Sequence, residues 1–330
     1  MAALPGEALP GVGTQSPPLP IIKRHQNRKA EIFIHITLFQ ALLLGVFQGL
    51  TEFLPVSSTA HMAIVPQLLF HMDDPGAAFS AVVQLGPIVA IILYFRNDLV
   101  QYAEGVMRTG SLKNVKNDDI SAKLGWYTLL GTIPLLIFGV LLEHKIDTAF
   151  RDLHVIAISL IGLALVLWYA ESTAKRNHSL EQTTFKEAMT IGLAQVLALV
   201  PGTSRSGVTI TAGLLQGLDR ESAARFSFLL SIPAISAAGL YKLAKVLHHL
   251  GGDAGTYVLA AIVAGIVAYV VIYLFLGYMK EHSTGIFIGY RIALGLLVLY
   301  LLHTGALISK PPVEGPSHET RAMSIPSHEQ

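Results

Sequence analysis

Two segments of this chain place reactive side chains inside otherwise apolar sequence. The first runs from Gln48 to His61 and contains Glu52 and the hydroxyl residues 57–59. The second runs from Pro201 to Thr209 and contains Arg205 between two serines. An ionisable group at membrane depth is costly, so such a group usually marks a functional site. These residue types together suit chemistry on a phosphate.

Both segments contain residues that could start a new helix. Ser57 or Ser58 would cap the helix after the first break, and Ser204 or Ser206 would cap the helix after the second. Two helix N-termini that face one space would offer unpaired N–H groups and partial positive charge, which bind phosphate. Arg205 would add a planar fork that holds two phosphate oxygens. The predicted phosphate-binding residues are Ser57, Ser204, Arg205 and Ser206.

Glu52 has no place in a simple anion site, so we expect a further role for it. A carboxylate beside phosphate oxygens is reasonable where Mg²⁺ or Ca²⁺ bridges them, or where it directs a proton or a water. Gln48 lies one helical turn earlier on the same face and could supply a neutral oxygen to the ion. The sequence thus predicts a divalent cofactor held by Glu52 and Gln48.

Ser58 and His61 fall on adjacent turns of the helix after the first break. The imidazole could take a proton from the hydroxyl or protonate a leaving group. With Glu52 and Arg205, these residues predict a catalytic set for phosphoryl transfer. We favour Ser58 as nucleophile and His61 as acid or base. The alternative is that Glu52 and Arg205 form only a structural ion pair, which would not require hydroxyl-rich breaks in both segments.

Composition identifies the chain as a membrane protein that crosses the bilayer several times. Hydrophobic residues make up 52% of it and charged residues 14%, against about 25% in soluble domains. With a formal net charge of +1, nothing in the composition suggests a nucleic-acid partner, which would require a basic patch or stripe. Uncharged runs long enough to span, or nearly so, are Pro75–Phe95, Leu124–Leu142, Leu153–Ala170, Phe226–Tyr241, Ala254–Met279 and Ile292–Ser309.

The two reactive segments belong to a duplicated unit. Ala41, Gly45, Gln48 and Leu50 match Ala188, Gly192, Gln195 and Leu197 at one constant offset, and Phe79-Ser80 matches Phe226-Ser227 at the same offset. Broken helices survive at membrane depth where protein or a wet cavity surrounds them, so each segment is predicted to be a re-entrant hairpin. Three crossings between the two hairpins would invert the second copy.

The predicted fold class is therefore an all-α polytopic membrane protein with two inverted repeats. Each repeat is a re-entrant helix hairpin plus three transmembrane helices. We expect a flexible extension over residues 1–30, one membrane domain over residues 31–309, and a flexible tail over residues 310–330. The repeats would cover about residues 31–170 and 186–309.

Lys and Arg are unevenly distributed between the two sides of the predicted membrane domain. The side with residues 96–123, 171–187, 219–225 and Lys280 has more of them than the side with residues 144–152 and 242–253. The first side is therefore predicted to be cytoplasmic. Four basic residues near the N-terminus argue for the opposite orientation, namely Lys23, Arg24, Arg28 and Lys29.

Both motifs resemble those of the undecaprenyl-diphosphate phosphatase family, whose members are also called bacitracin-resistance proteins. Gln48 to His61 is similar to the family's (E/Q)-x-x-x-E motif with its trailing P-V-S-S-T-x-H, and Pro201 to Thr209 is similar to P-G-x-S-R-S-G-x-T. Similarity extends over about residues 38–304. Gln48 stands where Glu is commoner, which leaves Glu52 as the only carboxylate of that motif.

The resemblance implies a hydrolase of the bacterial inner membrane that removes the terminal phosphate of undecaprenyl diphosphate. Such an enzyme recycles the lipid carrier for cell-wall synthesis and confers bacitracin resistance. The resemblance also implies a divalent cation and a site that opens to the periplasm. By motif position it assigns functional roles to Glu52, Ser58, His61, Ser204, Arg205 and Thr209, the last as a phosphate ligand.

The expected partners are the polyprenyl diphosphate and the surrounding membrane lipids, with a homodimer left open and no nucleic acid. The alternative function is a transporter or flippase for a lipid-linked or anionic substrate, because inverted repeats and broken helices also build carriers. A carrier would need the anion site, but it would have no use for Ser58 and His61 beside Glu52.

Overall fold

The computed structural model describes residues 36–72, 75–142, 152–246 and 254–309, and these residues contain no β-strand. The extension over residues 1–30 and the tail over residues 310–330 lie outside the described residues. The helices are α1 (Leu38–Thr51), α2 (Ser58–Phe70), α3 (Gly76–Val83), α4 (Leu85–Tyr94), α5 (Arg96–Thr109), α6 (Ile120–Leu141), α8 (Leu153–Thr173), α9 (Phe185–Ala194), α10 (Arg205–Leu215), α11 (Arg220–Val246), α12 (Ala254–Glu281) and α13 (Gly285–His303). Short 3₁₀ helices are η1 (Leu112–Asn114), η3 (Leu180–Gln182) and η4 (Gln195–Leu199).

Five of the described helices are long and apolar enough to cross a membrane, namely α6, α8, α11, α12 and α13. A sixth crossing is formed if Phe79–Tyr94 and α5, which meet at a bend of 75°, are one span. The prediction of an all-helical polytopic membrane protein is therefore confirmed for the part of the chain that the structure describes.

Several helices extend past the boundaries that were predicted from uncharged runs. The helix α11 begins at Arg220 rather than Phe226, and α13 begins at Gly285 rather than Ile292. The added turns contain arginines whose charges are satisfied inside the protein. Arg220 pairs with Glu171, and Arg291 donates to backbone carbonyls. The ends of the uncharged runs are therefore not the ends of these helices.

The helices that lead into the two reactive segments, α1 and α9, start in the same way. Thr37 caps α1 in a capping box with Gln40, and Thr184 caps α9 in a capping box with Glu187. In each box the threonine side chain accepts from the third helical N–H, and the longer side chain accepts from the cap N–H. Thr37 and Thr184 are as far apart in sequence as Ala41 and Ala188.

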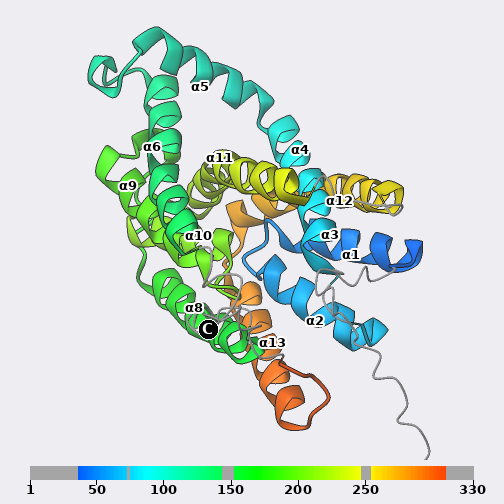
Figure 1. Cartoon of the computed structure of the whole chain (residues 1–330). Coiled ribbons are helices and arrows are strands. Elements are labelled where there is room, and N and C mark those ends of the chain that lie inside the picture. Colours follow the sequence, from blue (N-terminus) through cyan, green and yellow to red (C-terminus); the bar gives the residue numbers. More distant parts are fainter. Residues whose placement is uncertain (1–35, 73–74, 143–151, 247–253, 310–330) are drawn as a thin grey trace, which may run out of the picture. The chain divides into compact units, whose positions relative to one another are not determined.

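Glycines let both of these helices approach a long neighbour closely. The helix α1 lies along α12, where a Cβ added at Gly45 would lie 2.5 Å from the carbonyl oxygen of Ala260 (Figure 1). The helix α9 packs on α6, where an added Cβ at Gly192 would overlap the backbone of Gly131. Such small-residue contacts replace the hydrophobic driving force that is absent between helices in lipid.

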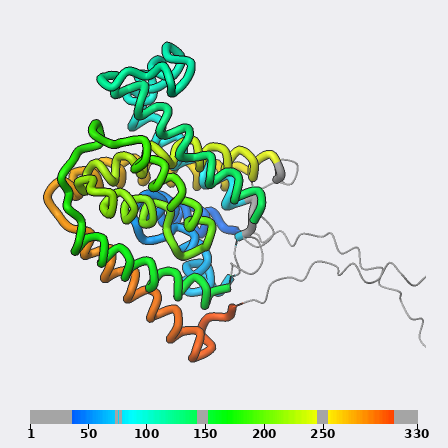
Figure 2. Tube along the Cα trace, turned by 90° about the vertical axis from the view of Figure 1, so that its left-hand side faces the viewer, coloured from blue at the N-terminus to red at the C-terminus, as the bar shows by residue number. Residues whose placement is uncertain are grey.

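Two further helix contacts involve α8, which packs on α13 and on α10. The helices α8 and α13 run side by side, as Figure 2 shows. The helix α10 packs against α8 and α11.

The start of α6 is fixed by Asp119. Its side chain caps the helix, and the hydrogen bonds that it accepts from the Ala122 N–H and from Arg108 lower the pKa of its carboxyl group. Arg108 thereby ties α5 to α6.

Candidate active site

The two breaks share one backbone conformation. Ser57 has φ of 73° and ψ of 96°, and Ser204 has φ of 68° and ψ of 115°. Positive φ is uncommon for residues other than glycine and persists where the surroundings enforce it. Each serine is the cap of the following helix, since Ser57 Oγ accepts from Ala60 N and Ser204 Oγ accepts from Gly207 N. Of the two alternatives at each break, the caps are thus Ser57 and Ser204.

Residues from both breaks line one cavity of about 160 Å³. Its polar lining comes from Glu52, Ser57, Ser58, Thr59 and Gln84 on one side and from Ser204 and Arg205 on the other. The remaining lining comes from apolar residues of α6, η4 and α11, namely Leu135, Ala198, Leu199, Ala234, Ile235 and Ala238. The structure therefore brings the two motifs together beside an apolar wall.

Glu52 connects the two motifs through its carboxylate. One oxygen, Oε2, accepts from Gln48 Nε2 at 2.9 Å and from Ser58 Oγ at 2.8 Å. The other oxygen, Oε1, lies 3.5 Å from Nη2 of Arg205. The side chains of Glu52 and Arg205 are 6% and 11% exposed, so this is a buried pair in which each charge offsets the burial cost of the other.

Arg205 retains donor capacity for a ligand. Its Nη2 also lies 3.4 Å from the main-chain oxygen of Glu52, whereas its buried Nη1 has no hydrogen-bond partner among the described residues. The guanidinium lies over the ring of Phe53, with Cζ 5.8 Å from the ring centroid. Phe53 is itself held by an edge contact with Phe228 of α11. The orientation of Arg205 is therefore set by neighbours on the first break.

The hydrogen bonds of His61 and Ser58 go to other partners, whereas the sequence favoured a proton transfer between the two side chains. Ser58 donates to Glu52, whereas the ring nitrogens of His61 face the Ser57 carbonyl oxygen and the Tyr290 hydroxyl. His61 is also absent from the cavity lining. In this arrangement Glu52 is the acceptor nearest the Ser58 proton, and the predicted transfer from Ser58 to His61 has no hydrogen bond to follow.

Two predicted phosphate ligands, Ser206 and Thr209, do not line the cavity. Ser206 Oγ donates to the Leu54 carbonyl at 3.0 Å, and Thr209 Oγ1 lies 2.6 Å from Ser227 Oγ. Both residues are fully buried and their hydroxyls are used inside the protein. They fix α10 against the first break and α11, while Ser57, Ser204 and Arg205 do line the cavity.

Comparison with known proteins shows the family of the chain. Residues 41–297 match the family model described as "Bacitracin resistance protein BacA". The chain belongs to this family. A protein of Pelodictyon phaeoclathratiforme is 49% identical over 82% of this chain and 99% of its own length. Proteins of Chlorobium chlorochromatii and Chlorobium phaeovibrioides are each 47% identical over 82% and 83% of this chain, and all three are named undecaprenyl-diphosphatase.

The residues of this BacA-family cavity fit a substrate-bridging cation better than a permanently held one. The described part of the chain has no group of three His, Asp or Glu side chains that could hold a metal. Glu52 offers one carboxylate, and Gln48 turns its amide nitrogen toward it rather than lining the cavity. Mg²⁺ is commonly bound by one or two carboxylates together with substrate phosphates and waters. Glu52 would be the carboxylate of such a site.

Arg291 was missed in the sequence and binds both breaks. It is fully buried on α13, and its Nη1 donates to the Pro55 carbonyl at 3.2 Å. Its Nη2 donates to the carbonyls of Gly202 and Thr203 at 3.2 and 2.9 Å. Its Nε donates to Leu160 of α8. The signal was a single arginine inside an apolar stretch, which the search for uncharged runs excluded.

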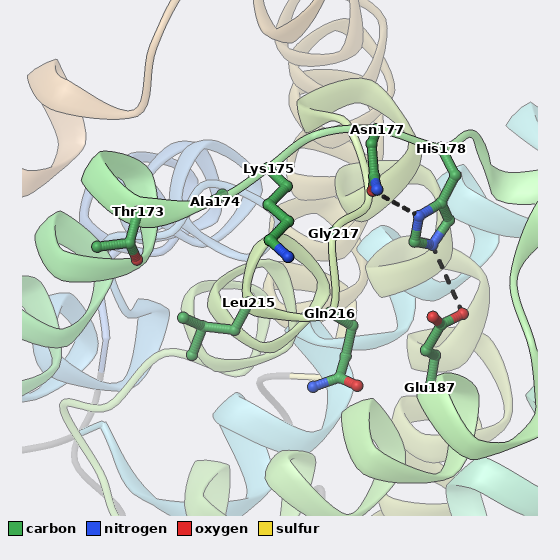
Figure 3. Close-up of a pocket in the computed structure, with 9 residues that line it drawn as sticks. All are labelled: Thr173, Ala174, Lys175, Asn177, His178, Glu187, Leu215, Gln216 and Gly217. Carbon is green, nitrogen blue, oxygen red and sulfur yellow. Dashed lines mark hydrogen bonds and ion pairs between the residues drawn. The ribbon is translucent and has the colours of Figure 1, made fainter.

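A second, larger cavity of about 360 Å³ contains none of the motif residues. It lies at the C-terminal ends of α8 and α10 and is lined by Thr173, Lys175, His178, Glu187 and Gln216, among others (Figure 3). His178 Nε2 lies 3.5 Å from Glu187 there. The smaller cavity is the candidate active site, because of the two it is the one that combines the buried charge pair, the Ser58 hydroxyl and two helix starts.

Proposed function

We propose that this chain hydrolyses undecaprenyl diphosphate to undecaprenyl phosphate and inorganic phosphate. It would thereby recycle the lipid carrier of cell-wall synthesis and confer bacitracin resistance. The observation that carries this proposal is the contact of Glu52 with both Ser58 and Arg205 inside one buried cavity. It is supported by the relatives named undecaprenyl-diphosphatase, which match this chain over nearly their whole lengths.

The chemistry follows from the hydrogen bonds of the cavity. Ser58 Oγ attacks the terminal phosphorus while its proton passes to Glu52 Oε2, 2.8 Å away. An O–P bond to Ser58 forms, and the bond from that phosphorus to the bridging oxygen breaks. Glu52 passes this proton to the bridging oxygen, which leaves on undecaprenyl phosphate, so the carboxylate is ionised again. Glu52 then takes a proton from the attacking water and returns it to Ser58 Oγ as the O–P bond of the phosphoserine breaks and phosphate is released.

Charge on the transferred phosphoryl group is stabilised from the second break. Arg205 supplies Nη1, which has no other partner among the described residues, and the first turns of α2 and α10 supply backbone N–H groups. Donors that are fixed before the substrate arrives, in a site with little water, stabilise a developing charge strongly. Glu52 would hold a divalent ion, which would supply further positive charge to the diphosphate.

The apolar wall of the cavity suits a lipid. Leu135, Leu199 and Ala238 lie beside the charged residues, and a polyprenyl chain that follows them remains in an apolar environment. Leu135 and Ala238 belong to the C-terminal halves of α6 and α11, away from the side that is rich in Lys and Arg. If that basic side is cytoplasmic, the cavity opens to the periplasm of the inner membrane.

The proposed fold is a pair of inverted repeats with re-entrant hairpins. Its support is the matched detail of the two halves: the threonine caps of α1 and α9, the close contacts of Gly45 and Gly192, and the positive φ of Ser57 and Ser204. Each pair is separated by the same number of residues. The helix α1 of the first half packs on α12 of the second, and α9 packs on α6 of the first.

Phosphate release from undecaprenyl diphosphate by the purified protein in detergent tests the function. Glu52→Gln, Ser58→Ala and Arg205→Lys should each lose at least ~100-fold in kcat, since each removes a group that acts on the reacting phosphate. Lys175→Ala, in the second cavity, is the matched control and should turn over as wild type. Mass spectrometry of the quenched reaction should find phosphate on Ser58.

Two outcomes would contradict the proposal. Near-normal turnover of Glu52→Gln or Arg205→Lys would show that the charge pair takes no part in the reaction. Movement of the lipid across sealed vesicles without release of phosphate would instead support the transporter.

A further inference from the structure

His61 is held on both sides and lies outside the cavity. Its Nδ1 is 2.8 Å from the Ser57 carbonyl oxygen, and its Nε2 is 2.6 Å from the Tyr290 hydroxyl of α13. The imidazole is parallel to within 24° with the ring of Phe47, and the residue is only 4% exposed. Neither nitrogen is therefore available to Ser58 or to a substrate phosphate in this arrangement.

The partners determine where the proton of the neutral ring lies. A carbonyl oxygen can only accept, so Nδ1 carries the hydrogen and donates it to Ser57. Nε2 then has a lone pair and accepts from the Tyr290 hydroxyl. Tyr290 is the titratable side chain that contacts His61 in the described part of the chain, since Phe47 and Ser57 contribute no charge.

The carbonyl that His61 holds belongs to a strained residue. Ser57 has φ of 73°, and a non-glycine residue in such a conformation costs ~1–3 kcal/mol that its surroundings must offset. The same Ser57 carbonyl also accepts from the main-chain N–H of His61 at 3.3 Å. Ser58 follows directly, so the direction of its hydroxyl depends on how the Ser57 peptide is fixed.

The two breaks differ in what holds their backbone, and only the first has a histidine. His61 matches Val208 at the offset that relates Ser57 to Ser204, and valine has no polar group for the Ser204 carbonyl. The second break is instead held by Arg291 at both Gly202 and Thr203, whereas Arg291 reaches only Pro55 in the first. His61 supplies an additional donor at the first break.

We propose that His61 and Tyr290 form a positioning pair that holds the Ser57 peptide and so directs Ser58 toward the substrate. The proton of Ser58 goes to Glu52, and His61 exchanges no proton with the substrate. This inference rests on the proposed phosphatase function for its kinetic test, and the tautomer of His61 provides a second test that does not depend on activity.

Substituting His61 with Asn or with Gln distinguishes a positioning role from a role in proton transfer. The amide nitrogen of His61→Asn lies close to where Nδ1 is, so it can donate to the Ser57 carbonyl, whereas that of His61→Gln lies closer to Nε2. We expect His61→Asn to retain kcat within ~10-fold and His61→Gln to lose ~100-fold, because only the first restores the held carbonyl. Neither amide titrates, so the pH profile of His61→Asn should keep both limbs of the wild-type profile.

Matched controls are available on the same helix. His71 is exposed at the end of α2 with φ of 51°, a conformation that Asn tolerates, so His71→Asn and His71→Gln should turn over as wild type. Size-exclusion chromatography shows whether each variant is folded. If His61→Asn is folded and as inactive as His61→Gln, or if its profile loses a limb, His61 is an acid, a base or a nucleophile and the proposal is overturned.

Nitrogen NMR of the protein labelled with ¹⁵N-histidine gives the independent result. The resonance that disappears in His61→Asn should have the shifts of a ring protonated at Nδ1, and Tyr290→Phe should move it. A ring protonated at Nε2 and insensitive to Tyr290→Phe overturns the proposal even if the enzyme is active. A wild-type protein that shows the Nδ1 tautomer but releases no phosphate would instead refute the proposed function.

Discussion

Replacing Arg291 with lysine tests whether one buried cation holds the two breaks in place. Arg291→Lys keeps the positive charge but replaces a planar fork by a single ammonium group. The guanidinium now serves three break carbonyls, those of Pro55, Gly202 and Thr203, which come from segments far apart in the sequence. A single ammonium group cannot donate to all three carbonyls as the guanidinium does, so we expect at least two carbonyls to lose their hydrogen-bond partner.

The size of the effect follows from those lost bonds. A buried carbonyl without a partner costs ~1 kcal/mol at the low end, so two of them lower the free energy of unfolding by ~2 kcal/mol. In a protein of this size that corresponds to a fall in Tm of ~3 °C. Phosphate release should fall as well, because Ser58 and Arg205 start the helices that follow these breaks.

The assay is thermal unfolding in detergent together with phosphate release. Arg96→Lys is the matched control, because Arg96 is exposed and donates to one carbonyl, that of Leu93. Its Tm and turnover should stay at the wild-type values. If Arg291→Lys also unfolds and turns over like wild type, the contacts of Arg291 do not hold the breaks, and our account of how the cavity is built is wrong.

Two further predictions concern packing and the cation. Gly45→Ala should lower the stability by ~1–3 kcal/mol, because its Cβ would meet Ala260 of α12 at 2.5 Å, whereas Gly162→Ala meets nothing within 4 Å and should not destabilise. Equal Tm values for both variants would refute the close contact of α1 with α12. Chelation of divalent ions should stop phosphate release, and Mg²⁺ or Ca²⁺ should restore it. Full turnover with excess chelator would mean that Arg205 and the helix starts neutralise the diphosphate alone.

Much of the candidate site was predictable because its residue types are rare in a membrane. Glu52 and Arg205 were noticed as costly charges beside clustered hydroxyls, and the structure places them 3.5 Å apart. The sequence left two candidate cap residues at each break. It could not distinguish Ser57 from Ser58, because both have the same side chain. The structure distinguishes them by the positive φ of Ser57.

Other features could not be read from the chain because they depend on distant backbone. Ser58 and His61 lie on adjacent turns, which made their contact plausible. Instead, His61 Nε2 lies within hydrogen-bond distance of the hydroxyl of Tyr290, which is more than two hundred residues away in the sequence. Arg291 was excluded from its span because a charge was taken as a boundary. Its partners are main-chain carbonyls, and carbonyls have no signature in a sequence.

The sequence by itself determined the class of protein, the two motifs, their duplication and the family. These properties follow from hydropathy, from residue type and from spacing, which act over short stretches. Only the tertiary structure decided which hydroxyl faces Glu52, which nitrogen of His61 faces the Ser57 carbonyl, and that Ser206 and Thr209 are used inside the protein. Those outcomes depend on which donor and acceptor meet across separate helices, and packing in three dimensions decides that.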